Sequence, residues 1–79
     1  MSRQPARHIA LTIGQNIRAA RGATTQRELA IALDVPSLYV SRWERGQVKP
    51  DALNQQKLAD VLFEGDISAL YRETDKEAA

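Results

Sequence analysis

The sequence contains no cysteine, so neither a disulfide nor a thiolate metal site can stabilise the fold. No apolar run approaches the ~20 residues that a transmembrane helix needs. Arg3 and Arg7 are not followed by an apolar stretch of signal-peptide length. Aromatic residues are scarce, and the complete set is Tyr39, Trp43, Phe63 and Tyr71. We therefore expect a soluble, cytoplasmic protein whose core is built from aliphatic residues.

The residue patterns of an enzyme are missing too. The chain has no glycine-rich phosphate loop and no recognisable Ser/His/Asp frame, and 79 residues leave little room for a substrate pocket in the core. His8 is the single histidine, and without cysteine it gives no metal site. We expect no enzymatic activity, no cofactor and no bound metal.

What the chain does have is enough apolar residues for one small domain and an uneven charge distribution. Hydrophobic residues make up 43% of the sequence, and the net charge is only +1. Residues 1–50 nevertheless carry a balance of +5, whereas residues 51–79 carry −4. A basic half beside an acidic half suits a polyanion-binding face with a solvated back. Ordinary clustering of charges in a short chain is the alternative.

Apolar residues recur at helical spacing along most of the chain, and no strand-like alternation of useful length interrupts them. The spacing of Ile9, Ile13, Ile17 and Ala20 predicts a first helix ending near Arg21–Gly22. Thr25 followed by Glu28 is a capping-box pattern that opens a second, and Asp51 is the expected cap of a fourth, which carries Leu53 and Leu58. The expected helices therefore cover about residues 9–21, 26–33, 37–45, 52–63 and 67–71.

These boundaries divide the chain into three parts. We expect a flexible basic arm over residues 1–8, a helical domain over residues 9–72 and a frayed acidic tail over residues 73–79. The arm could enter a DNA minor groove through Arg3 and Arg7, or it could be disordered.

Residues 26–46 carry the most informative pattern. Two short helices joined by three or four residues cross steeply, which requires a small residue where they approach and a turn residue that tolerates left-handed geometry. Ala30 and Asp34 meet these two requirements. The aliphatic residues that would fix the second helix in place are Leu29, Val35 and Val40. The pattern predicts a helix-turn-helix.

Over about residues 13–71 the chain resembles the phage repressor and Cro family of helix-turn-helix proteins. The matching segments are Gln26-x-x-Leu29-Ala30, Val40-Ser41-Arg42-Trp43-Glu44-x-Gly46 and Lys49-Pro50, preceded by Ile13-Gly14-x-x-Ile17-Arg18-x-x-Arg21 and followed by Leu58-Ala59-x-x-Leu62. The resemblance implies an all-α, compact five-helix, lambda-repressor-like domain.

The chain departs from the family pattern at three places. The link from Arg21 to Gln26 is two residues shorter than usual, Asp34 stands where glycine is common, and Pro36 replaces the usual serine or threonine cap. The sequence therefore leaves the first residue of the third helix undetermined by one position. Ser37 could provide the side-chain cap that Pro36 lacks.

The resemblance also assigns roles to individual residues. Contact with DNA base edges is implied for Ser37, Leu38, Tyr39 and Arg42. Contact with the DNA backbone is implied for Gln26, Arg27, Trp43, Arg45 and Lys49, and a structural salt bridge for Arg21 and Glu44. The alternatives are core packing for Leu38 and Trp43, and a solvated surface position for the other side chains proposed to contact DNA.

The function implied is a sequence-specific transcriptional regulator of Cro or repressor type, encoded by a phage or mobile element. Its partner would be a double-stranded DNA operator, bound by a homodimer whose contact surface lies around Leu70 and Tyr71. The alternatives are the antitoxin of a toxin–antitoxin pair, which binds a partner protein and its own operator, and a pure protein-interaction module.

Overall fold

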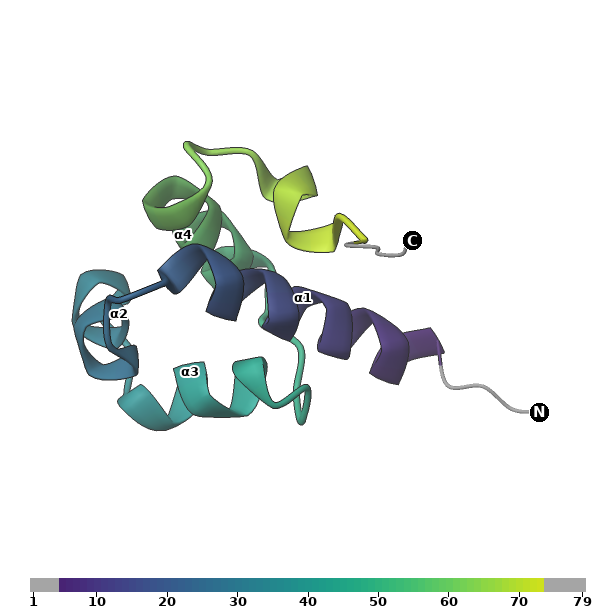
Figure 1. Ribbon diagram of the computed structural model, residues 1–79, viewed down its shortest axis with the longest axis horizontal. Coiled ribbons are helices and arrows are strands. Elements are labelled where there is room, and N and C mark those ends of the chain that lie inside the picture. The colour runs from purple at the N-terminus through teal and green to yellow at the C-terminus, as the bar shows by residue number, and fades with distance from the viewer. Residues whose placement is uncertain (1–4, 74–79) are drawn as a thin grey trace.

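The computed structural model describes residues 5–73 of the chain, and all regular structure in that range is helical (Figure 1). Its principal extents are 38, 23 and 21 Å. The elements are α1 (Pro5–Arg21), α2 (Gln26–Leu33), α3 (Ser37–Glu44), α4 (Ala52–Leu62) and the 3₁₀-helix η1 (Ile67–Tyr71). No helix among these residues combines the length and the apolar character needed to cross a membrane.

Side chains at the start of three elements explain where those elements begin. Thr25 accepts a hydrogen bond from the Glu28 N–H, and the Glu28 carboxylate accepts one from the Thr25 N–H, both at 3.0 Å. This is the capping box expected for α2. Asp51 caps α4 by accepting the Asn54 N–H at 2.9 Å, and Asp66 does the same for Ser68 in η1 at 3.0 Å.

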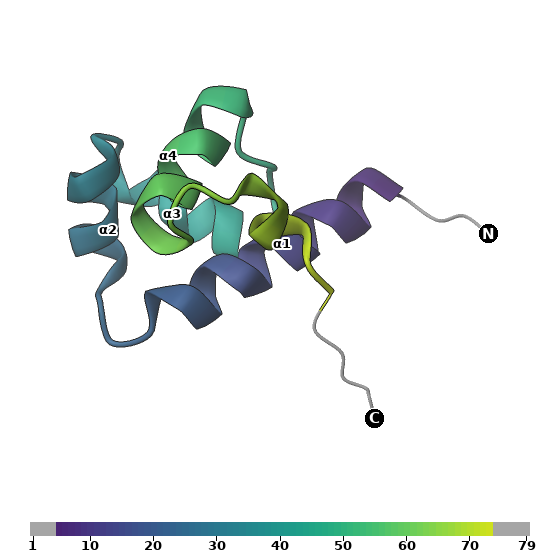
Figure 2. The same cartoon turned by 90° about the horizontal axis from the view of Figure 1, so that it is seen from above.

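Helix α1 is the support on which the other elements are assembled. It lies between α3 on one side and α4 with η1 on the other, while α2 closes one end of the molecule (Figure 1). Seen from above, the N-terminal turns of α1 extend beyond the other helices (Figure 2). Helix α3 is therefore held on one side of the continuous 17-residue helix α1, and α2 lies at the end of α1.

The core is aliphatic, with a single aromatic ring fully inside it. Its buried members come from every element: Ile13, Ile17, Leu29, Ala30, Leu33, Val40, Trp43, Leu58 and Leu70. Helices α1 and α3 approach so closely that Gly14 faces main-chain atoms of α3. A Cβ added at Gly14 would stand 2.9 Å from the Glu44 carbonyl oxygen and closer still to that of Trp43. Glycine is thus required here for helix contact.

The structure differs from the expected fold in four details. The fifth helix is a 3₁₀-helix of five residues, so the described chain has four α-helices. The arm expected over residues 1–8 is helical from Pro5, because proline suits a first helical turn. Residues 1–4 of that arm and residues 74–79 of the expected tail lie outside the described residues. Ala20 and Leu53 are exposed, and Leu53 is 66% accessible.

Candidate nucleic-acid interface

The turn between α2 and α3 is set by two residues with unusual backbone roles. Asp34 adopts the left-handed conformation at φ 61° and ψ 47°, and its N–H bonds back to α2. This is a geometry that aspartate tolerates better than most residues. Pro36 precedes α3 in extended geometry and makes no side-chain cap, and Ser37 does not replace that cap. Helix α3 begins at Ser37, which settles its register.

Helix α3 has an inner face in the core and an outer face toward solvent. Val40 is fully buried and Trp43 is 3% exposed. On the outer face, Leu38 is 51% exposed and Tyr39 44%, so core packing of Leu38 is excluded. Ser37 and Arg42 are exposed beside them. All four side chains for which the resemblance implied base contact are therefore accessible on one short helix.

The inner end of α3 is fixed by a charged network. The Arg21 guanidinium donates to both carboxylate oxygens of Glu44, from Nε at 2.6 Å and from Nη2 at 2.9 Å. The Gln26 amide donates to the same carboxylate at 2.9 Å. The Glu44 side chain is only 4% exposed. One carboxylate thus joins the end of α1, the start of α2 and the end of α3.

Opposing effects act on the ionisation of this carboxylate. Burial raises the pKa of Glu44, but the hydrogen bonds from Arg21 and Gln26, together with the positive charges of Arg21 and Arg18, outweigh it and leave the pKa below its ordinary value. The bond to Glu44 in turn raises the pKa of Arg21. The network is therefore an ion pair at neutral pH, as the resemblance implied for Arg21 and Glu44.

The remaining basic side chains surround α3 without entering the core. Arg27 is exposed on α2, and Arg45 is exposed just after α3, where it donates to the Ser41 hydroxyl at 2.7 Å. Lys49 is exposed in the segment between α3 and α4, with its ammonium 6.0 Å from the centre of the Tyr71 ring. These three cations and Gln26 are the residues for which the resemblance implied contact with the DNA backbone outside the core.

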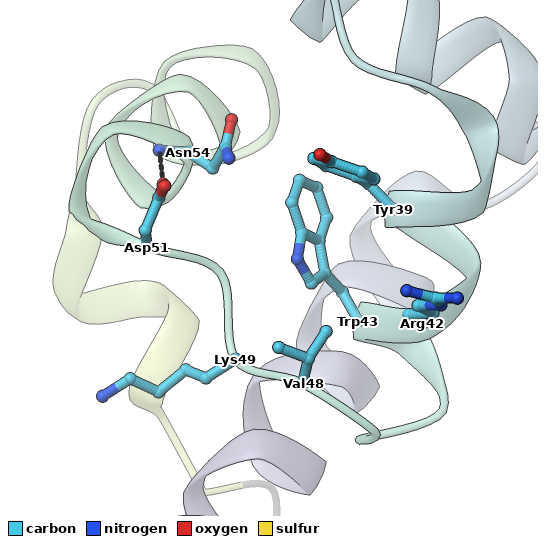
Figure 3. Close-up of a pocket in the computed structure, with 7 residues that line it drawn as sticks. All are labelled: Tyr39, Arg42, Trp43, Val48, Lys49, Asp51 and Asn54. Carbon is cyan, nitrogen blue, oxygen red and sulfur yellow. Dashed lines mark hydrogen bonds between the residues drawn. The ribbon is translucent and has the colours of Figure 1, made fainter.

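A cavity of about 320 Å³ lies between α3 and the start of α4 (Figure 3). It is lined by Tyr39, Arg42, Trp43, Val48, Lys49, Asp51 and Asn54. The ring of Trp43 packs edge-on against Tyr39, with centroids 6.1 Å apart. Its nitrogen edge faces the side of the cavity formed by α4, and among the residues drawn it has no hydrogen-bond partner (Figure 3). Trp43 is a core residue that keeps one polar edge toward the cavity.

The sequence did not reveal a second set of polar contacts, which involves α1, α4 and η1. Gln55 is buried at 9% exposure, donates to the Pro50 carbonyl at 2.8 Å and accepts the Tyr71 hydroxyl at 2.6 Å. Asn16 donates to the carbonyls of Leu70 and Arg72 at 2.7 and 2.8 Å. The sequence signal that could have revealed the burial of Gln55 is its spacing. It precedes Leu58 and Ala59 by three and four residues, which places it on the same face of the helix.

Comparison with known proteins identifies the family. The family model described as helix-turn-helix matches residues 17–67, which is more than half of the chain. The chain belongs to the helix-turn-helix family. The match takes in α2, the turn, α3 and α4, and it confirms the family resemblance seen in the sequence.

One curated relative within the helix-turn-helix proteins has a regulatory name. Over 69 residues the chain is 41% identical to the HTH-type transcriptional regulator DicA of Escherichia coli strain K12, covering 85% of this chain and 51% of that protein. The chain thus spans about half the length of this relative. No solved structure matches significantly.

Proposed function

We propose that this protein is a sequence-specific DNA-binding transcriptional regulator of Cro or repressor type that reads the major groove with α3. The observation that carries the proposal is the outer face of α3, where two large apolar side chains, Leu38 and Tyr39, stand in solvent beside Arg42. An apolar side chain exposed at a helix start gains nothing from water, but it can contact a thymine methyl group. Family membership and the regulatory name of DicA support this choice.

Within this proposal the side chains divide by what they would touch. Arg42 would donate both arms of its guanidinium to one guanine, and Ser37, Leu38 and Tyr39 would meet neighbouring base edges. Gln26, Arg27, Arg45 and Lys49 would meet phosphates, which supply affinity without sequence information. Trp43 would contribute only its N–H, because its ring is enclosed. An origin in a phage or mobile element is part of the proposal and rests on the resemblance.

We propose further that the protein binds as a homodimer to two half-sites about 34–36 Å apart, one turn of DNA. A single small module makes few contacts, and pairing supplies the missing affinity. The dimer surface expected around Leu70 and Tyr71 needs revision: Leu70 is fully buried and cannot contact a second copy, whereas Tyr71 is 37% exposed.

Selection of bound duplexes from a random pool tests the proposal. The expected result is an enriched site with two similar, inverted halves. Binding to the selected duplex should weaken as salt rises, with a slope of log affinity against log salt of about −3 to −4 per protomer, because each neutralised phosphate contributes about −0.9. A pool without enrichment, together with salt-independent binding, would contradict DNA recognition.

A further inference from the structure

We propose that Gln55 and Tyr71 are positioning residues that hold the segment 46–51, and with it Lys49, in place for contact with the DNA backbone. This inference rests on the proposed function. Neither side chain lies on α3. The sequence predicted no role for Gln55, and it placed Tyr71 at the dimer surface and not at the DNA. The argument starts from the polar contacts that join the segment after α3 to α4 and η1.

Gln55 is a buried polar residue, and both polar groups of its side chain are bonded. Its Nε2 donates to the Pro50 carbonyl at 2.8 Å, and its Oε1 accepts the Tyr71 hydroxyl at 2.6 Å. Pro50 is itself fully buried and has no N–H, so its carbonyl is its only main-chain hydrogen-bonding group. Gln55 therefore fixes the end of the segment that carries Lys49.

Tyr71 contacts the same segment at two points. Its hydroxyl reaches Pro50 through Gln55, and its ring lies under the Lys49 ammonium, with 6.0 Å between nitrogen and ring centre. A cation at that distance from a tyrosine face is attracted by the ring. Tyr71 thus restrains both the backbone beside Lys49 and the direction of its side chain.

The segment is bonded to α3 at its start, where the Gly46 and Gln47 N–H groups donate to the Trp43 and Arg42 carbonyls at 3.0 Å each. It begins at Gly46, which has φ 72°, and the side chains of Gln47, Val48 and Lys49 are all exposed. A lysine on such a segment would pay an ordering cost on meeting a phosphate, and restraint before binding reduces that cost. The contacts through Gln55 and Tyr71 are that restraint.

Binding to a mixed-sequence DNA duplex tests the inference, since phosphate contact does not depend on sequence. The variants are Gln55→Leu and Tyr71→Phe, each made alone and combined with Lys49→Ala. Gln56→Leu is the matched control, because Gln56 is the exposed neighbour of Gln55 and bonds only to Asp60 on the outside of α4. Affinity is measured at several salt concentrations, and thermal unfolding confirms that each variant is folded at the assay temperature.

We expect Gln55→Leu and Tyr71→Phe each to weaken binding about three- to tenfold, the range for ordering one flexible side chain. Both variants should make the slope of log affinity against log salt shallower, toward the slope measured for Lys49→Ala. The control Gln56→Leu should bind DNA with the affinity of the unmodified chain. In the Lys49→Ala background neither change should weaken binding further, because a residue that acts through Lys49 has no effect without it.

Four results would overturn the inference. Equal losses with and without Lys49 would show a general structural role, and a lowered melting temperature at unchanged affinity would show that the network serves stability alone. If Lys49→Ala weakens binding but Tyr71→Phe and Gln55→Leu do not, the inference fails while the proposed function stands. If the unmodified chain binds no duplex at low salt, both the inference and the proposed function are contradicted.

Discussion

Arg21 and Glu44 are 23 residues apart in the sequence, yet their side chains are joined by two hydrogen bonds of 2.6 and 2.9 Å. The pair connects the last residue of α1 to the last residue of α3. The Glu44 side chain is 4% exposed and that of Arg21 is 16% exposed. Water therefore has little access to replace the hydrogen bonds that either side chain would lose without its partner. Removing one partner leaves the other enclosed.

Arg21→Ala should therefore lower stability before it affects any ligand. The stranded Glu44 carboxylate keeps only the Gln26 amide, and breaking such a covered pair costs about 3 kcal/mol in the free energy of unfolding. Urea titration measures the change. Arg27→Ala, at an exposed site on α2, should leave the unfolding midpoint nearly unchanged. Equal midpoints for the Arg21 variant and the unmodified chain would show that the pair adds no stability.

Acid should remove the contribution of Glu44. Its pKa lies below the ordinary value of 4.5 in the folded protein, so its stabilisation is fully present above that value and is lost as the pH falls through the folded pKa. Between about pH 5 and pH 2 the free energy of unfolding should fall more steeply for the unmodified chain than for Glu44→Gln. Parallel curves for the two proteins would contradict the lowered pKa.

Gly14→Ala should destabilise the fold although alanine is the better helix former. The gain in helix propensity is about 1 kcal/mol. The new methyl group, however, meets the carbonyl oxygens of Trp43 and Glu44, which are main-chain atoms and cannot rotate away. Overpacking of this kind costs about 1–3 kcal/mol or more, so we expect a lower melting temperature. Gln15→Ala, at the exposed neighbouring position, is the control and should be neutral or stabilising.

Arg42→Ala and Lys49→Ala should impair DNA binding in different ways. If Arg42 grips a guanine, its loss costs about 1–3 kcal/mol of discrimination at one base pair and little elsewhere. Lys49 lies beyond α3 and would meet a phosphate, so its loss should weaken all sequences alike and reduce the salt slope by about one unit. Affinities for the selected duplex and its single-base variants, at two salt concentrations, separate these outcomes. Uniform weakening by Arg42→Ala would assign Arg42 to the backbone and move base reading to Ser37, Leu38 and Tyr39.

Local chemistry made much of this fold predictable from sequence. The capping box of Thr25 and Glu28, the cap at Asp51 and the left-handed turn at Asp34 each depend on residues within a few positions of one another. The family resemblance added the long-range pair of Arg21 and Glu44, which no local pattern could have given. The outer face of α3 followed from the inward position of Val40 and the helical repeat.

The sequence was least informative where burial depends on distant parts of the chain. Leu53 is apolar, but it lies about 200° around α4 from Gln55, whose face is the buried one, and so it points to solvent. Gln55 is polar and was passed over, because its partners Pro50 and Tyr71 come together only in the folded molecule. Pro5 was read as part of an arm when it was the first residue of a helix.

The contact at Gly14 has a consequence for how binding preference can change over evolution. Because α1 meets α3 through main-chain atoms, the position of α3 there is set by its peptide backbone and not by the identity of its outward side chains. Substitutions at Ser37, Leu38, Tyr39 or Arg42 can therefore accumulate without shifting the helix that presents them. If this face reads DNA as proposed, the supporting contact and the reading side chains can change independently, so related chains can acquire new target sites on one scaffold.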